Sequence, residues 1–160
     1  MIIRPAVLAD AAAMTRLQNR IIALGGTTAY EDTRDEAQII RSYIAPPEHG
    51  VCCHVAEIDA EVAGFQVVGL NPALPEGWAE IGTFVSQDIQ ARGIGQALFA
   101  ATKPAARAAG LKVLNATIRA DNVPGLAYYA RIGFTDYKTD PDWALKSGQV
   151  VGRVSRRLDL

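Results

Sequence analysis

The sequence predicts one domain of the α/β or α+β class. The chain has 160 residues, an ordinary length for one domain with a real core. Hydrophobic residues make up 49% and charged residues 21%, which is typical of a globular chain rather than a disordered one. Short runs with strand-like alternation are interspersed with amphipathic segments of helical period. This order indicates a sheet covered by helices.

The N-terminal segment predicts a short strand followed by a helix. Residues 2–4, Ile-Ile-Arg, predict a short strand. Apolar residues then recur three and four apart up to Leu24, which is the period of a helix. Asp10 stands before this periodic segment, so we expect its side chain to cap the helix. The pair Gly25-Gly26 ends it.

The next segment predicts a second helix and two strands. Thr33 and Glu36 lie three residues apart and form a candidate capping box, and Pro46-Pro47 stops the helix that they open. Two alternating runs, 51–58 and 61–70, follow around a tight turn. We therefore expect two neighbouring antiparallel strands there.

The second half of the chain alternates between strands and helices. A helix is expected from Ile94 to about Ala109, because its apolar period continues through Pro104. Another helix begins at Asp121 or Asn122, both good capping residues. The strands are expected at 78–85, 113–118, 134–138 and 150–158.

Composition argues against nucleic-acid and membrane binding and favours a cytoplasmic location. The net charge of −1 gives no electrostatic basis for binding nucleic acid or an anionic membrane. No apolar run approaches the roughly 20 residues of a membrane span, and the N-terminus has no signal-peptide pattern. Cys52 and Cys53 are adjacent and rarely bridge in that arrangement, so a cytoplasmic location is expected. His49 and His54 lack neighbouring ligands, and no metal is expected.

The segment from Gln90 to Gly95 indicates a phosphate-binding loop. It joins the end of a strand to the start of a helix, where glycines allow a tight turn that points N–H groups at one spot. The spacing Gln-x-x-Gly-x-Gly differs from the three-glycine dinucleotide fingerprint and from the Gly-Lys-Ser/Thr loop. Arg92 can add a charged fork to the same site.

A second motif follows about thirty residues later. Residues 121–134 contain an asparagine that opens a helix, then a tyrosine, and then Gly133-Phe134 after the helix. Together with residues 90–95, this motif resembles the two signatures of the GNAT superfamily of N-acetyltransferases. The chain more weakly resembles the phosphinothricin acetyltransferase-like branch, from which the region around Trp143 departs.

The resemblance implies a fold and a co-substrate. The fold is a mixed, mostly antiparallel sheet with helices on both faces, which splays open between the strands 78–85 and 113–118. Acetyl-CoA would bind in that cleft as co-substrate, without a metal. The expected cofactor-binding residues are Phe84, Val85, Gln90, Arg92, Gly93, Ile94, Gly95, Gln96 and Asn122.

The resemblance also assigns roles to side chains. Glu80 is the candidate general base, with a solvated strand carboxylate as the plainer interpretation. Tyr129, four residues before Gly133, is the candidate acid that protonates the departing thiolate, with core packing as the plainer interpretation. The expected acceptor-site residues are Tyr30, Glu31 and Trp143.

The predicted function is acetyl transfer from acetyl-CoA to the amine of a small, amino-acid-like molecule by direct attack. One alternative is a non-catalytic acyl-CoA-binding module, which needs neither Glu80 nor Tyr129. Another is acetylation of peptide or protein N-termini. A different nucleotide-binding domain is disfavoured by the missing third glycine. Family resemblance also makes a homodimer possible.

Overall fold

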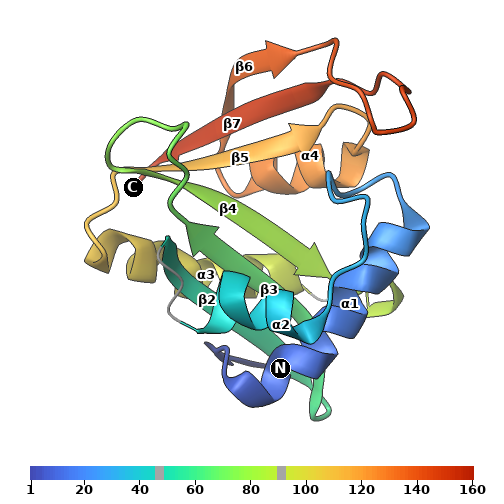
Figure 1. Ribbon diagram of the computed structural model, residues 1–160. Helices are drawn as coiled ribbons and strands as arrows, with labels where there is room; N and C mark the ends of the chain where they lie inside the picture. Colours follow the sequence, from blue (N-terminus) through green and yellow to red (C-terminus); the bar gives the residue numbers. More distant parts are fainter. Residues whose placement is uncertain (46–48, 90–92) are drawn as a thin grey trace.

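The computed structural model describes residues 1–45, 49–89 and 93–160 (Figure 1). Its strands are β1 (Ile2–Pro5), β2 (Gly50–Ile58), β3 (Glu61–Gly69), β4 (Trp78–Val85), β5 (Val113–Arg119), β6 (Thr135–Asp140) and β7 (Arg153–Asp159). Its α-helices are α1 (Ala11–Leu24), α2 (Glu36–Ile39), α3 (Ile94–Ala108) and α4 (Val123–Arg131). Short 3-10 turns occupy Leu8–Asp10 and Gln87–Ile89, and a π-helical turn, Ile40–Ile44, extends α2. The predicted order is confirmed, although the last strand begins three residues later than expected.

The strands form one seven-stranded sheet in the order β1-β2-β3-β4-β5-β7-β6. All neighbours are antiparallel except β4 and β5, which are parallel. This parallel pairing extends only from Trp78 opposite Val113 to Glu80 opposite Asn115. Beyond that pair the two strands separate, as Figure 1 shows. The predicted splayed, mostly antiparallel sheet is therefore confirmed.

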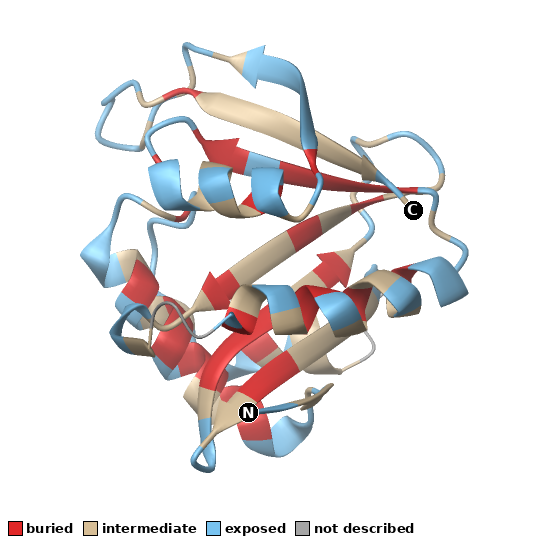
Figure 2. Ribbon diagram, turned by 180° about the vertical axis from the view of Figure 1, so that it is seen from behind, coloured by how far each residue is buried: buried red, intermediate tan, exposed pale blue. Residues whose placement is uncertain are grey.

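The helices cover the two faces of the sheet unequally. Helices α1 and α2 pack on one face of the β2–β4 half, while α3 packs on the opposite face. Helix α4 lies on the α3 side and covers β5 (Figure 2). Figure 1 shows no described helix over the other face of β5, β7 and β6. The sheet thus has an open face next to α1, beginning where β4 and β5 separate.

Alternation along β4 determines which side chains face which helices. Ile81 packs in the core cluster with residues of α3 and α4. Phe84 packs with α1 and α2 and stacks on Phe65 at 4.7 Å between ring centroids. Because side chains alternate along a strand, Glu80 lies on the same face as Phe84, toward α1. The side chains of β4 are thus divided between the α1 side and the α3 side of the sheet.

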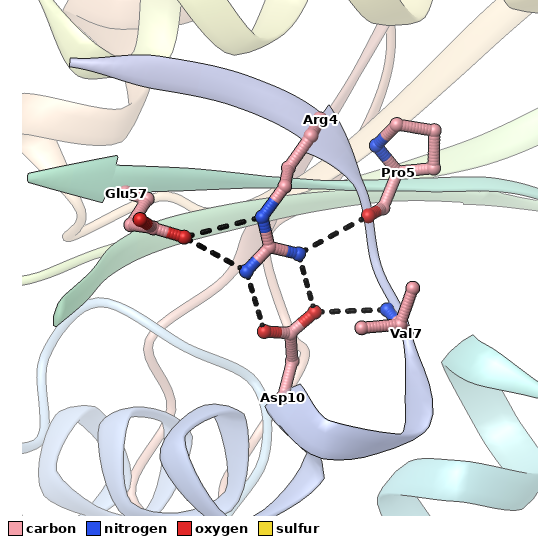
Figure 3. Close-up of polar contacts among 5 residues, drawn as sticks. All are labelled: Arg4, Pro5, Val7, Asp10 and Glu57. Carbon is pink, nitrogen blue, oxygen red and sulfur yellow. Dashed lines mark hydrogen bonds and ion pairs between the residues drawn. The ribbon is translucent and has the colours of Figure 1, made fainter. Parts of the chain in front are cut away.

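The expected cap of the first helix is wrong in its geometry. Asp10 lies at the end of the 3-10 turn, and its carboxylate accepts a hydrogen bond from Val7 N at 2.8 Å instead of capping α1 (Figure 3). The same carboxylate accepts two bonds from the Arg4 guanidinium, each at 2.8 Å. Arg4 also donates to Glu57 on β2 at 2.9 Å. The guanidinium therefore ties the start of α1 to the β1–β2 edge of the sheet.

The expected cap of the second helix is also wrong. Asp35, not Thr33, is the N-cap, and its carboxylate accepts from Gln38 N at 2.7 Å. The Gln38 side chain accepts in return from Asp35 N at 2.9 Å, which completes the capping box. Asp35 has the extended backbone that a capping residue needs. The helix therefore starts at Glu36, which was expected to be the box partner.

We expect Asp10→Asn to destabilise the protein by about 1–3 kcal/mol at pH 7, because it weakens a nearly buried, charge-assisted contact. The Arg4 guanidinium lowers the pKa of Asp10. Its contribution to stability is therefore complete above the unfolded pKa of about 3.9 and is lost as the pH falls through the lower folded value. Urea unfolding between pH 7 and pH 3 should show the difference between variant and parent narrowing below about pH 4.

The matched control is Asp88→Asn, because Asp88 forms an exposed ion pair with Arg20. That change should cost less than about 1 kcal/mol. Equal costs for the two variants would contradict the role given to Asp10.

Candidate active site

Glu80 lies at the point where β4 and β5 separate. It belongs to the last paired position of the two strands, opposite Asn115. One carboxylate oxygen accepts from Asn115 Nδ2 at 2.6 Å and the other from the backbone N–H of Thr117 at 3.0 Å. The second contact satisfies a β5 N–H just past the end of the pairing with β4. Glu80 is half-buried, so its carboxylate is both fixed in place and accessible.

Tyr129 reaches the same point from the opposite face. Helix α4 buries the ring, and the hydroxyl lies 3.0 Å from Thr83 Oγ1 and 3.5 Å from the carbonyl oxygen of Ile81, both on β4. Burial raises the pKa of Tyr129 above its ordinary value, and the negative charge of Glu80 raises it further. The phenol therefore stays protonated and can donate a proton.

Tyr128 joins α4 to α3. Its hydroxyl donates to the carbonyl oxygen of Gly95 at 2.9 Å and accepts from the buried amide of Gln66 at 3.1 Å. Gln66 also donates to Thr83 Oγ1 at 2.8 Å. These bonds place both adjacent tyrosines in one polar network beneath β3 and β4. Tyr128 therefore contacts the helix that follows the predicted phosphate-binding loop, whereas Tyr129 contacts β4, one of the two strands that separate.

The N-terminus of α3 has the geometry of an anion site. Gly93 is the N-cap with φ of +69°, a left-handed conformation that favours glycine, and no side chain of the described residues caps the helix there. Its first-turn N–H groups can therefore bind phosphate. Ile94 is buried in the core and Gln96 is exposed. The predicted contacts at Gln90 and Arg92 lie outside the described residues.

Gly95 is required for a reason other than backbone conformation. It has ordinary helical geometry, but a Cβ atom there would lie 2.7 Å from the ring of Tyr128. Only glycine leaves room for that ring on the first turn of α3. The second glycine of the motif therefore serves helix packing as well as the loop.

Asn122 caps α4, one of the two predicted caps. Its Oδ1 accepts from Gly125 N at 2.9 Å, and its Nδ2 donates to the carbonyl oxygen of Thr27 at 2.7 Å. Nearby, Arg119 donates to the carbonyl oxygen of Thr28 at 3.3 Å. These bonds fasten the loop after α1 to the carboxyl end of β5. The predicted contact of Asn122 with pantetheine stays a prediction, because its amide already has two partners.

Beyond Glu80, the edge of β4 that faces β5 has backbone groups that are not paired with that strand. Phe84 and Val85 pair with β3 on one side, whereas pairing with β5 has already ended at Glu80. Their side chains pack into cores on opposite faces of the sheet. Only main-chain groups of this edge can therefore serve a bound thioester or pantetheine arm, which is the role predicted for these two residues.

The predicted acceptor residues lie on the α1 side, in two places. Tyr30 and Glu31 line a shallow pocket of about 360 Å³ formed by the loop after α1. The Tyr30 ring centroid lies 6.3 Å from that of Phe84. The Glu31 carboxylate accepts from the backbone N–H of Lys146 at 3.0 Å and 3.1 Å, so it holds the β6–β7 connection. Trp143 lies elsewhere, under the guanidinium of Arg153.

Sequence reasoning missed the polar residues that surround Glu80 and Tyr129. They are Gln66, Thr83, Asn115, Thr117 and Tyr137. Asn115 and Gln66 did carry a signal, because each is a large amide inside an apolar strand run, and both are fully buried. Buried amides require partners, so these two positions carried a signal for a polar network but not for its members.

The cysteines are unsuited to covalent catalysis. Cys52 and Cys53 are free thiols whose side chains pack toward opposite faces of β2. Burial raises the pKa of Cys52 to about 11 and that of Cys53 to about 12. Both are protonated at neutral pH and are therefore poor nucleophiles. Among the described residues, no group of three or more His, Cys, Asp or Glu is placed to hold a metal.

Comparison with known proteins identifies the class. The model of the acetyltransferase (GNAT) family matches residues 20–134, and the chain therefore belongs to this family of acetyltransferases. A search of curated proteins gave no significant match.

Within the described residues, no helix is long and apolar enough to cross a membrane.

Solved structures share the fold across essentially the whole chain. Ribosomal-protein-alanine N-acetyltransferase from Brucella melitensis has 23% identity and a TM-score of 0.84, with 100% of both chains covered. The Salmonella typhimurium protein yncA, solved with its cofactor acetyl-CoA, has 23% identity and a TM-score of 0.83, with 99% of this chain and 93% of that chain covered. A phosphinothricin acetyltransferase from Sinorhizobium meliloti, in complex with acetyl-CoA, has 20% identity and a TM-score of 0.83, with coverages of 99% and 88%.

We expect Gly95→Ala to destabilise the protein by about 1–2 kcal/mol, because the new methyl group overlaps the Tyr128 ring. In an unobstructed helix the same change stabilises by about 0.5–1 kcal/mol. Introducing Gly95→Ala into a Tyr128→Ala background should therefore stabilise relative to Tyr128→Ala alone. Thermal unfolding of the four proteins measures both effects, and the same sign in both backgrounds would disprove the contact.

Proposed function

We propose that the chain is a cytoplasmic N-acetyltransferase that moves an acetyl group from acetyl-CoA to the amine of a small, amino-acid-like molecule. One observation carries the proposal. A carboxylate, Glu80, and a buried phenol, Tyr129, approach the same separation of β4 and β5 from opposite faces. Acetyl transfer from a thioester needs a base on the amine side and an acid on the thiol side, and this arrangement supplies both.

Glu80 is the proposed base. It lies on the open α1 side, where the predicted acceptor residues also lie. Its two hydrogen bonds hold the carboxylate in place beside the separating strands. It would accept a proton from the acceptor ammonium, directly or through water, as the amine attacks the thioester carbonyl.

Tyr129 is the proposed acid. Burial keeps its hydroxyl protonated, and the hydroxyl lies next to β4 on the α3–α4 side. It would donate its proton to the departing coenzyme A sulfur. The α3 N-terminus would hold the pyrophosphate, and the exposed edge of β4 at Phe84 and Val85 would hold the pantetheine arm.

Acetylation of peptide N-termini is the second candidate. The observation that favours it is the sheet face beside Glu80, which no described helix covers and which could admit an extended chain. The similar protein from Brucella melitensis is named for a protein substrate, whereas the one from Sinorhizobium meliloti is named for a small molecule. The acceptor panel below separates the two candidates.

We expect Glu80→Gln and Tyr129→Phe each to lower kcat by about 10²–10⁴-fold, with acetyl-CoA affinity nearly unchanged. The assay is thiol release with free amino acids, simple amines and alanine-initiated peptides as acceptors. Acetyl-CoA binding is measured separately by its shift of the melting temperature.

Glu76→Gln, in the exposed loop before β4, is the matched control and should keep full activity. Wild-type turnover by Tyr129→Phe would remove that residue from the mechanism. A melting shift with acetyl-CoA but no thiol release with any acceptor would favour a non-catalytic acyl-CoA-binding module.

A further inference from the structure

We propose that Asn115 and Tyr137 are positioning residues, which orient the Glu80 carboxylate at the splay. The inference rests on the base role proposed above for Glu80. It concerns two residues, one on the central strand β5 and one on the edge strand β6, that the motifs of the family signature do not include.

The three side chains form a continuous chain of hydrogen bonds. The Tyr137 hydroxyl donates to Asn115 Oδ1 at 2.5 Å, and Asn115 Nδ2 donates to Glu80 Oε2 at 2.6 Å. An amide has one accepting and one donating end. Because a carboxylate only accepts, the donating end of the amide must face Glu80, and the accepting end is left for the phenol.

Rotating the Asn115 side chain out of this arrangement would cost free energy. Its side chain is 1% exposed, and its Nδ2 also donates to Thr117 Oγ1 at 3.1 Å. Turning the amide over would place Oδ1 against the Glu80 carboxylate and leave two acceptors facing each other in a buried site. With Thr117 N as the second donor, Glu80 receives one hydrogen bond on each oxygen, and these two bonds fix the orientation of its carboxylate.

Tyr137 is held from the open face of the sheet. Its ring meets Trp78 edge-on at 5.6 Å between centroids, and the guanidinium of Arg157 lies 4.7 Å from the Trp78 centroid. The ring is 42% exposed, yet its hydroxyl points inward to Asn115. The β6–β7 hairpin thereby contributes to the environment of the base, although its strands are two and three places from β4 in the sheet.

The titratable and charged groups around Glu80 come from three other elements. They are Tyr129 from α4, Tyr137 from β6 and Arg157 from β7, which stands opposite Asn115 in the sheet. Both phenols are neutral at physiological pH because their pKa values are raised. The hydrogen bond from Asn115 is therefore the local contact to the carboxylate that a substitution can remove without changing charge.

The test is the titration of the Glu80 carboxyl, followed by NMR of protein labelled with 13C at glutamate carboxyl groups and assigned with Glu80→Gln. Asn115→Leu, which has nearly the same volume, should move the titration midpoint upward by about one pH unit. Tyr137→Phe, at an exposed edge position, should move it in the same direction by less. The acid limb of kcat/KM should move with the carboxyl titration in each variant.

Thr139→Val is the matched control, because Thr139 is an exposed hydroxyl residue on the same strand as Tyr137. It should leave the titration unchanged. Unchanged titrations in both folded Asn115→Leu and Tyr137→Phe would overturn the positioning role. A shifted titration in a protein that transfers acetyl to no acceptor would support the positioning role while rejecting the proposed function.

Discussion

The early end of β4–β5 pairing is the constraint on which the rest of the site depends. A strand that leaves its neighbour after three paired positions exposes backbone N–H and C=O groups that must find other partners. The carboxylate of Glu80 provides one of these partners by accepting from Thr117 N. The side chain that best explains the chemistry is thus also one that stabilises the opening of the sheet.

On both faces of the sheet, contacts between segments distant in the sequence hold the elements around the separating strands β4 and β5. Tyr128 of α4 bonds to Gly95 at the start of α3 on one face. On the other, Asn122 and Arg119 hold the loop after α1 to the end of β5. These contacts let β4 and β5 diverge while the helices and loops around them stay in register. The separation of β4 and β5 is therefore held by contacts within the chain on both faces of the sheet.

The sequence predicted the parts of the molecule that are determined by local pattern. Alternation located the strands, and the glycines marked the start of α3. Two helix caps were predicted wrongly: the Asp10 side chain does not cap α1, and Asp35 rather than Thr33 caps α2. Arg4, which lies on β1, decides the first case by drawing the Asp10 carboxylate away from α1. Such a choice depends on a tertiary contact that spacing does not encode.

The site itself shows the same division between local and long-range information. The family resemblance led to Glu80 and Tyr129. The partner of Glu80 is set by the register of β5 against β4, and the partner of Asn115 by a bulged pairing of β6 with β7. A helix turn of about 100° separates Tyr128 from Tyr129 and does not by itself say which phenol faces the opening. The structure resolves this through Thr83, which bonds to the hydroxyl of Tyr129, while Gly95 engages Tyr128. The contact with Thr117 N that satisfies a backbone group of β5 also fixes the position of the proposed base. Structural and catalytic interpretations of Glu80 are therefore two consequences of one interaction.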